Sequence, residues 1–162
     1  HFLIENTPLM KGGMNAESLM KEAILNQIEH IVLHYSNGAI DINTINEVSR
    51  LAKVNNIKVS FIMPVPTWPE SVPQILIKEL TNQSSPPIVT KLDYERSTKE
   101  LTDSLNINLN NQLKVYNISN YFCADKCIMA DSSGKPYYFD DGHLTLTGSE
   151  LLRNTFLKSL TN

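Results

Sequence analysis

The amino-acid sequence predicts an α/β protein, a three-layer α/β/α sandwich in which helices cover both faces of a mainly parallel sheet. Amphipathic helical patterns alternate with short, continuous apolar runs, which are typical of strands buried on both faces. No hairpin turns separate these runs, so consecutive strands need helical crossovers and run parallel. The length of 162 residues fits one domain over residues 1–162 that buries roughly two-thirds of its unfolded surface.

The first half of the chain supplies two helices and two strands. A stripe of apolar residues predicts a helix over residues 16–28, with Asn15 available as its N-cap. The elements expected after it are a buried strand over 31–35, a helix capped by Asp41 that ends at Asn55 and Asn56, and a strand in IKVSFIMPVP that Pro64 and Pro66 stop.

The second half is more irregular because residues 64–91 hold six of the eight prolines. The elements expected there are a short helix over 72–80, a helix over about 92–110, a strand in LKVYNI at 113–118, and a last helix that begins near Thr147. Thr147 and Glu150 have the spacing of a capping box, and an apolar stripe follows them.

Composition and charge exclude several classes of partner. Apolar residues make up 41% of the chain and charged residues 19%, which is a globular composition. The net charge of -3 and the scattered Lys and Arg residues argue against nucleic acid. No apolar run has the roughly 18 to 20 residues of a membrane span. The sequence begins at His1 and not at Met, so we interpret it as a processed protein or a segment of a longer one.

The stretch YYFDDGHLTLTGSELL, residues 137–152, holds the candidate site. Gly142 allows the chain to fold the carboxylate of Asp140 back toward His143. A carboxylate that accepts a hydrogen bond from one ring nitrogen leaves the other nitrogen as a base for a nucleophilic serine. Asp141 is the alternative to Asp140. On spacing alone, the two aspartates are equally well explained as turn residues and His143 as a packed ring.

Other polar and aromatic residues have structural explanations beside functional ones. Cys123 and Cys127 are too few for a tetrahedral zinc site, which favours a disulfide, although two reduced thiols are also consistent with the sequence. His30 and His34 have a helical metal spacing but lie in a predicted strand, where they would share one face as core or edge residues. Trp68 would stack on a sugar or pack over prolines, and the same alternatives hold for Tyr137 and Tyr138, at least one of which should anchor the loop.

The phrase YYFDDGHLTLTGSELL resembles the last block of the SGNH (GDSL-like) hydrolase fold, in which Asp and His precede the final helix. The likeness is strongest to SGNH domains attached to membrane-bound acyltransferases of family three, which O-acetylate bacterial surface polysaccharides. HIVLHYS, IKVSFIMPVP and CADKC followed by GKPYYFDDGHLT match that branch in pattern and order. The paired cysteines of the branch favour a disulfide and a periplasmic location.

The resemblance implies that Asp140 orients His143 and that His143 is the general base. The family's Gly-Asp-Ser segment is not found in the sequence, so the first strand and the nucleophilic Ser are expected outside it. Ser36 is the internal serine to consider, but it lacks the glycines of a nucleophile elbow and fits a strand-ending turn. Asn37 would line the site and help hold the oxyanion.

Three functions follow from this resemblance. The first is the extracytoplasmic domain of an O-acyltransferase, tethered to the inner membrane, which receives its acyl donor through a membrane domain and passes the group to a carbohydrate acceptor, without metal or cofactor. The second is a free-standing carbohydrate esterase that uses the same residues with water as the acceptor. The third is a non-catalytic glycan-binding module of the same fold.

Overall fold

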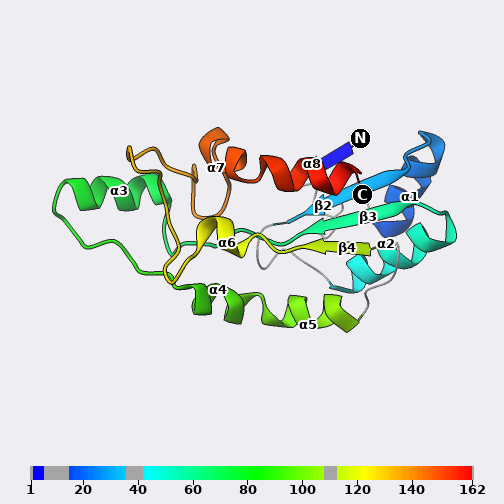
Figure 1. Cartoon of the computed structure of the whole chain (residues 1–162), viewed down its shortest axis with the longest axis horizontal. Coiled ribbons are helices and arrows are strands. Elements are labelled where there is room, and N and C mark those ends of the chain that lie inside the picture. Colours follow the sequence, from blue (N-terminus) through cyan, green and yellow to red (C-terminus); the bar gives the residue numbers. More distant parts are fainter. Residues whose placement is uncertain (1, 6–14, 36–41, 108–112, 162) are drawn as a thin grey trace.

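Four parallel strands form one sheet in the order β1–β2–β3–β4 (Figure 1). The computed structural model describes residues 2–5, 15–35, 42–107 and 113–161. The strands are β1 (Phe2–Glu5), β2 (His30–His34), β3 (Lys58–Ile62) and β4 (Leu113–Tyr116). The helices are α1 (Ala16–Leu25), α2 (Ile42–Val54), α3 (Val72–Leu80), α4 (Lys91–Ser97), α5 (Lys99–Ile107), α6 (Ser119–Phe122), α7 (Leu146–Leu151) and α8 (Arg153–Thr161). The predicted α/β class with a parallel sheet is confirmed.

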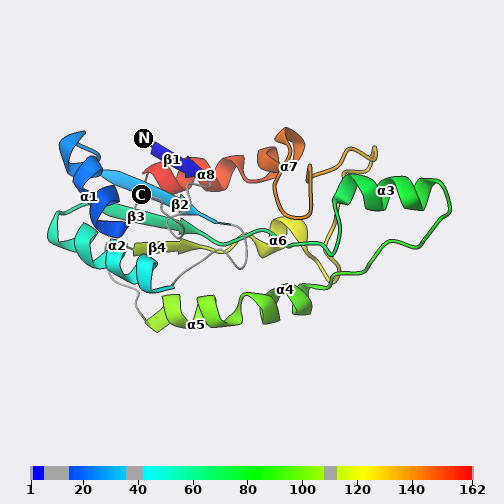
Figure 2. The ribbon, with the colours of Figure 1, turned by 180° about the vertical axis from the view of Figure 1, so that it is seen from behind.

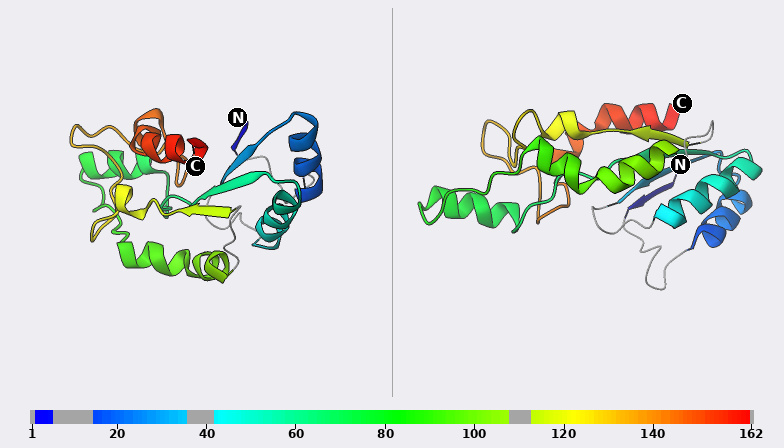
Figure 3. Two further views of the ribbon diagram at one scale, coloured as in Figure 1. Left: turned by 45° about the vertical axis from the view of Figure 1, so that its right-hand side comes forward. Right: turned by 90° about the horizontal axis from the view of Figure 1, so that it is seen from below.

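Helices cover both faces of the sheet, as the alternating pattern predicts. In Figure 3, α8 lies on one side of the sheet, and α1, α2 and α5 lie on the other. Strands that follow each other in sequence are neighbours in the sheet, and α1, α2 and α5 in their connections lie over the same face. The carboxyl ends of β2, β3 and β4 therefore point to one edge, where α3, α6 and α7 lie (Figure 2).

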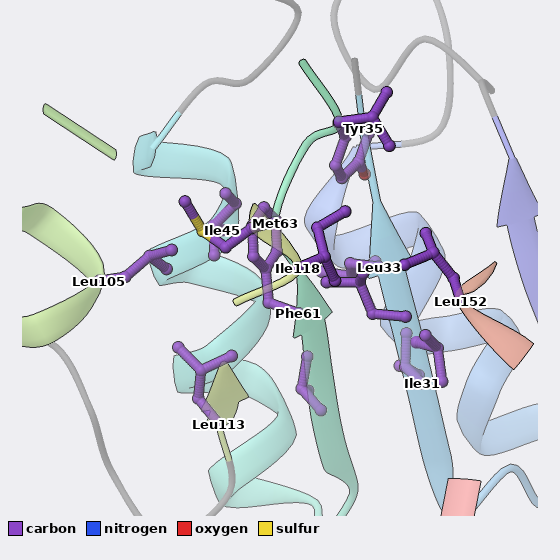
Figure 4. Packing of buried hydrophobic residues seen from close by; sticks show 14 of the residues in the cluster. Ile31, Leu33, Tyr35, Ile45, Phe61, Met63, Leu105, Leu113, Ile118 and Leu152 are labelled. Carbon is purple, nitrogen blue, oxygen red and sulfur yellow. The ribbon is translucent and has the colours of Figure 1, made fainter. Parts of the chain in front are cut away.

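Strands β2 and β3 are buried on both faces, which explains why their apolar runs are continuous. Ile31, Leu33 and Phe61 are each at most 2% exposed. Figure 4 shows them together with Leu152, the residue that joins α7 to α8. Full burial of a side chain of this size contributes about 1.5–3 kcal/mol, so these residues hold the sheet between its helices.

The two strand histidines pack under α8 and have structural partners. His30 Nε2 lies 2.8 Å from Ser60 Oγ, and the Ser60 hydroxyl donates to the carbonyl of Ser159 at 2.9 Å. Burial lowers the pKa of His30. The ring of His34 meets the ring of Phe156 edge to face, with centroids 6.3 Å apart. The prediction of core or edge histidines on one face is confirmed.

Helix ends depart from the sequence predictions where local polar groups intervene. The predicted helix over 92–110 is two helices, α4 and α5, because Thr98 interrupts it. The hydroxyls of Ser97 and Thr98 both donate to the carbonyl of Tyr94, at 2.8 and 2.9 Å, in addition to the amide of Thr98 at 3.0 Å, and hydroxyl bonds of this kind bend helices. The helix predicted over 16–28 ends at Leu25, because Gln27 has a φ of 54°.

Two elements were not predicted. Strand β1 has only four residues and pairs in parallel with β2, and α6 is a single turn after β4. Elements this short have too few residues to display a period. The predicted cap Asp41 lies outside the described residues.

Candidate functional site

A short antiparallel ladder over residues 137–145 carries the candidate site. The amide of Phe139 donates to the carbonyl of His143 at 3.0 Å, and the amide of Thr145 donates to the carbonyl of Tyr137 at 2.9 Å. These two rungs fix the ends of the segment that contains Asp140 and His143. The segment lies at the edge of the sheet where the parallel strands end (Figure 1), which is where ligands bind in open α/β sheets.

Asp140 holds His143 through both of its carboxylate oxygens. Oδ2 lies 2.7 Å from Nδ1 of the imidazole. Oδ1 accepts from the amides of Gly142 and His143, at 2.9 and 2.7 Å. The arrangement fixes the ring with its proton on Nδ1 and leaves Nε2 as the basic nitrogen. The His143 side chain is 41% exposed, so it is accessible to a reacting group.

The surroundings of Asp140 keep its carboxyl group ionised. Partial burial tends to raise the pKa of the carboxyl, but hydrogen bonds from the amides of Gly142 and His143 and from the imidazole outweigh it, and the pKa lies below its ordinary value. A lowered pKa adds stability above the pKa of the unfolded chain, and this stability is lost as the pH falls through the lowered value. At neutral pH the carboxylate is therefore charged and able to stabilise an imidazolium.

Main-chain groups of the segment after β3 and of the first residue of α3 hold the Asp140 loop. The amide of Trp68 donates to the carbonyl of Asp141 at 2.8 Å, and the amide of Val72 donates to the carbonyl of Asp140 at 3.0 Å. A Cβ on Gly142 would come within 3.3 Å of Thr67 Cγ2, so the loop packs closely on this segment. The position of the carboxylate thus depends on the turn that follows β3.

Of the two aspartates, Asp140 is the one that bonds to the imidazole. The side chain of Asp141 is exposed, and its carbonyl, not its carboxylate, makes the contact with Trp68. The preference for Asp140 over Asp141 therefore agrees with the geometry.

Phe139 is a further part of the site, which the sequence motif alone does not reveal. Its ring stacks on the imidazole of His143 with centroids 5.5 Å apart and an angle of 18° between the planes. Phe139 is nevertheless 59% exposed, so its outer face is open to solvent. The sequence offers one clue to this contact, which is that Phe139 lies two residues after Tyr137, on the side of the ladder that pairs with His143.

The other aromatic residues near the loop are buried and structural. Trp68 is 4% exposed and meets Tyr138 edge to face, with centroids 6.1 Å apart. Tyr138 is fully buried, and burial raises its pKa. Tyr137 packs edge to face on Phe122. Both tyrosines anchor the loop, as predicted for at least one of them, and packing is the correct alternative for Trp68.

The predicted last helix is divided into α7 and α8, and α7 begins earlier than the spacing of Thr147 and Glu150 predicts. Thr145 is the N-cap of α7, and its side chain accepts from the amide of Gly148 at 3.2 Å. The same hydroxyl donates to the carbonyl of Pro136 at 2.8 Å. The Thr145 hydroxyl therefore satisfies both an amide at the start of α7 and a carbonyl of the loop. This explains why the cap lies two residues before Thr147.

Gly148 is required because the carbonyl of Tyr137 approaches α7 closely. A Cβ at this position would lie 2.1 Å from the Tyr137 carbonyl oxygen and 2.9 Å from Leu144 Cδ2. We expect Gly148→Ala to lower the free energy of unfolding by about 1–3 kcal/mol through overpacking, measured by urea denaturation. Ser149→Ala in the same helix is the control and should stay within about 0.5 kcal/mol of the parent. Equal stability of the two variants would contradict this packing.

Cys123 and Cys127 form a disulfide, as favoured from the sequence. Both residues are buried, at 2% and 8% exposure. The amide of Cys127 donates to the carbonyl of Val89 at 2.8 Å, so the small loop is also paired to the segment before α4. Closing a loop this short lowers the conformational entropy of the unfolded chain. In the entropic model this stabilises the folded protein by about 2 kcal/mol.

Ser36 and Asn37, the remaining predicted site residues, lie outside the described residues. Within the described ranges, no serine hydroxyl forms a hydrogen bond with His143. In the same part of the chain, no group of three His, Cys, Asp or Glu residues is arranged to hold a metal ion. None of the helices that the structure describes is long and apolar enough to cross a membrane.

A parallel sheet between helices, with an Asp–His pair at its carboxyl edge and just before the last helices, defines a domain of the SGNH type. The model of the family "SGNH domain (fused to AT3 domains)" matches residues 14–158, and the chain belongs to this family. The recognition of this branch from the terminal block is confirmed.

A solved structure shares this fold. The periplasmic domain of the lipopolysaccharide acetyltransferase of Salmonella ser. Paratyphi A matches with a TM-score of 0.64 and 19% sequence identity. The match covers 90% of this chain and 62% of that one, so the chain spans less than two-thirds of its length. A search of curated proteins gave no match.

Proposed function

We propose that the chain is the extracytoplasmic SGNH domain of an O-acyltransferase that transfers an acetyl or other acyl group to a bacterial surface polysaccharide. The observation that carries the proposal is the 2.7 Å hydrogen bond between Asp140 and a solvent-accessible His143. Membership of a family described as fused to AT3 domains supports acyl transfer as the chemistry.

The proposed reaction has two steps. In the first, His143 Nε2 removes the proton from a serine hydroxyl, and the serine oxygen attacks the acyl carbonyl. The bond to the donor breaks, and the imidazolium returns the proton to the leaving group. In the second step a sugar hydroxyl loses its proton to His143 and attacks the acyl-serine carbonyl. The bond to the serine oxygen breaks, the imidazolium returns the proton to that oxygen, and the sugar ester is released. The serine comes from outside the residues that the structure describes.

The chain's own residues supply the base and its orientation. Asp140 keeps the proton on Nδ1 and stabilises the positive charge that forms on the ring in both steps. The buried tyrosines and the main-chain bonds from Trp68 and Val72 hold the loop that carries this pair in place. Fixed groups of this kind need little reorganisation when charge develops.

The proposed setting is the periplasm, with a membrane-bound AT3 domain as the source of the acyl group. The similar Salmonella structure is a periplasmic domain by its description, and the family is named for its fusion to AT3 domains. A disulfide is consistent with an oxidising compartment.

The fate of a labelled acyl group tests the function. Membranes that contain the complete protein receive a radiolabelled acetyl donor and the surface polysaccharide, and the label is followed in polysaccharide and in free acetate. We expect label in the polysaccharide that mild alkali releases. Free acetate that exceeds polysaccharide label by far would indicate an esterase. Absence of both, with a folded protein that binds glycan, would indicate a non-catalytic module.

A further inference from the structure

The ring of Phe139 is exposed, although its two aromatic neighbours on the ladder are buried. Tyr137 and Tyr138 are 8% and 0% exposed, whereas Phe139 is 59% exposed. A phenylalanine ring has no polar group that gains from contact with water, so this exposure forgoes apolar burial. Among the aromatic contacts of the described residues, the ring of Phe139 meets only that of His143. Phe139 therefore belongs to the site and not to the anchor of the loop.

The backbone of the ladder places Phe139 directly opposite His143. Tyr138 pairs with Leu144 in antiparallel fashion, so residues 139 and 143 form the next pair. The amide of Phe139 donates to the carbonyl of His143 at 3.0 Å. Side chains of directly opposed residues lie on the same face of an antiparallel pair, with Cβ atoms about 4.5–5.5 Å apart. The contact between the two rings thus follows from the pairing of the chain.

The hydrogen bond from Asp140 does not by itself fix the plane of the imidazole. It joins Oδ2 to Nδ1 at 2.7 Å, so it holds one ring atom, and the ring can still tilt about that atom. The ring of Phe139 stacks on the imidazole with centroids 5.5 Å apart and 18° between the planes. This second contact restrains the tilt. The two contacts together set the direction of Nε2, which is the nitrogen that takes the proton.

The same contact places an aromatic face beside the charge that forms during the reaction. The face of an aromatic ring carries partial negative charge, and a cation within about 6 Å of the ring centroid is attracted to it. The centroid separation of 5.5 Å between Phe139 and His143 lies within this range. The imidazole becomes positive only when Nε2 takes a proton. The attraction therefore favours the transition states over the resting enzyme.

We propose that Phe139 is a positioning residue, whose ring fixes the plane of the His143 imidazole and stabilises the positive charge that the imidazole carries during acyl transfer. The inference rests on the proposed function, and it extends the Asp140–His143 pair by an aromatic residue that acts on the face of the base.

The kinetics of the complete protein test this role. Phe139→Ala should lower kcat for label transfer by about threefold to 100-fold, the lower figure for loss of the attraction between ring and cation and the upper for a displacement of Nε2 by about 1 Å. KM for the acceptor should stay within about twofold of the parent, because Phe139 acts through the base. An unchanged kcat would overturn the inference. A higher KM at constant kcat would also overturn it, because Phe139 would then be a substrate contact.

Two further variants separate stacking from bulk. Phe139→Tyr keeps the aromatic face and should retain kcat within about twofold, whereas Phe139→Leu keeps only apolar bulk and should lose at least about threefold. Ile77→Ala on α3 is the matched control, because Ile77 is also 59% exposed, and it should keep the kcat of the parent. Phe139→Ala and Ile77→Ala should both keep the thermal unfolding midpoint of the parent. Equal kcat in Phe139→Leu and the parent would reject the role of the aromatic face.

The NMR signals of the imidazole give a readout that does not depend on turnover. The histidines of the chain are labelled with ¹³C and ¹⁵N, and the signals of His143 are assigned by their loss in His143→Ala. Protons that lie over an aromatic face are shielded. The ring protons of His143 should therefore move downfield in Phe139→Ala and Phe139→Leu and keep their positions in Phe139→Tyr. Signals that do not move in Phe139→Ala would show that the rings do not stack in solution, and would overturn the inference.

Failure of this inference and failure of the proposed function give different results. Acetyl transfer by the parent with no change in Phe139→Ala rejects the role of Phe139 and keeps the proposed function. A parent protein that transfers no acetyl group rejects the proposed function, and the NMR signals then decide by themselves whether Phe139 orients the imidazole.

Discussion

His143→Ala is expected to reduce acetyl transfer by the complete protein by at least about 10⁴-fold, since removal of the histidine from a serine-protease triad costs about six orders of magnitude in kcat. The variant leaves no group to take the proton from the serine or the sugar hydroxyl. The measurement is the initial rate of label transfer to polysaccharide. Because the side chain is 41% exposed, its loss should leave the fold intact.

Two controls separate loss of chemistry from loss of structure. The thermal unfolding midpoint of His143→Ala should stay close to that of the parent. Added imidazole, which can occupy the space left by the side chain, should restore a part of the rate. A folded variant with the transfer rate of the parent would remove His143 from the mechanism.

Asp140→Asn is expected to lower the transfer rate by about 10⁴-fold, as the equivalent change does in a well-studied triad. The asparagine can keep the acceptor for the amides of Gly142 and His143, so the loop geometry should persist. Its amide, however, donates where the carboxylate accepts, which places the proton of the imidazole on Nε2. The unprotonated nitrogen is then Nδ1, which faces residue 140 and not the serine. The imidazolium also has no negative charge beside it.

Asp141→Asn is the matched control for this change. It alters a neighbouring exposed carboxylate whose backbone, and not its side chain, contacts Trp68. We expect its rate to remain within about threefold of the parent, equivalent to roughly 0.7 kcal/mol. A large loss of transfer rate in Asp141→Asn, together with an active Asp140→Asn, would show that Asp141 and not Asp140 orients His143.

The fold was predictable where a hydrophobic period is long or a run is continuous. The helix over 72–80 was predicted with the bounds of α3, and the buried strands β2 and β3 followed from their apolar runs. The break at Thr98 was not predictable from periodicity, because the apolar positions continue across it. It coincides with two hydroxyls, of Ser97 and Thr98, that bond to the carbonyl of Tyr94 together with the amide of Thr98.

The site was predictable to the extent that it is local in sequence. Asp140 and His143 are three residues apart, so their hydrogen bond requires only one turn. The stacked position of Phe139 was not predictable, because it depends on a pairing of residues 137–139 with 143–145 that its sequence neighbours do not specify.

The disulfide has a practical consequence for the preparation of this protein. It lies next to Phe122, whose ring packs on Tyr137 and Tyr138 behind the candidate base. In a host whose cytosol keeps thiols reduced, Cys123 and Cys127 would stay unbonded, and the segment that contains Phe122 would lose this covalent constraint. The sheet can still form in such molecules. Batches from reducing and oxidising hosts are therefore expected to differ in specific activity, and thiol titration of each batch should precede any comparison of rates.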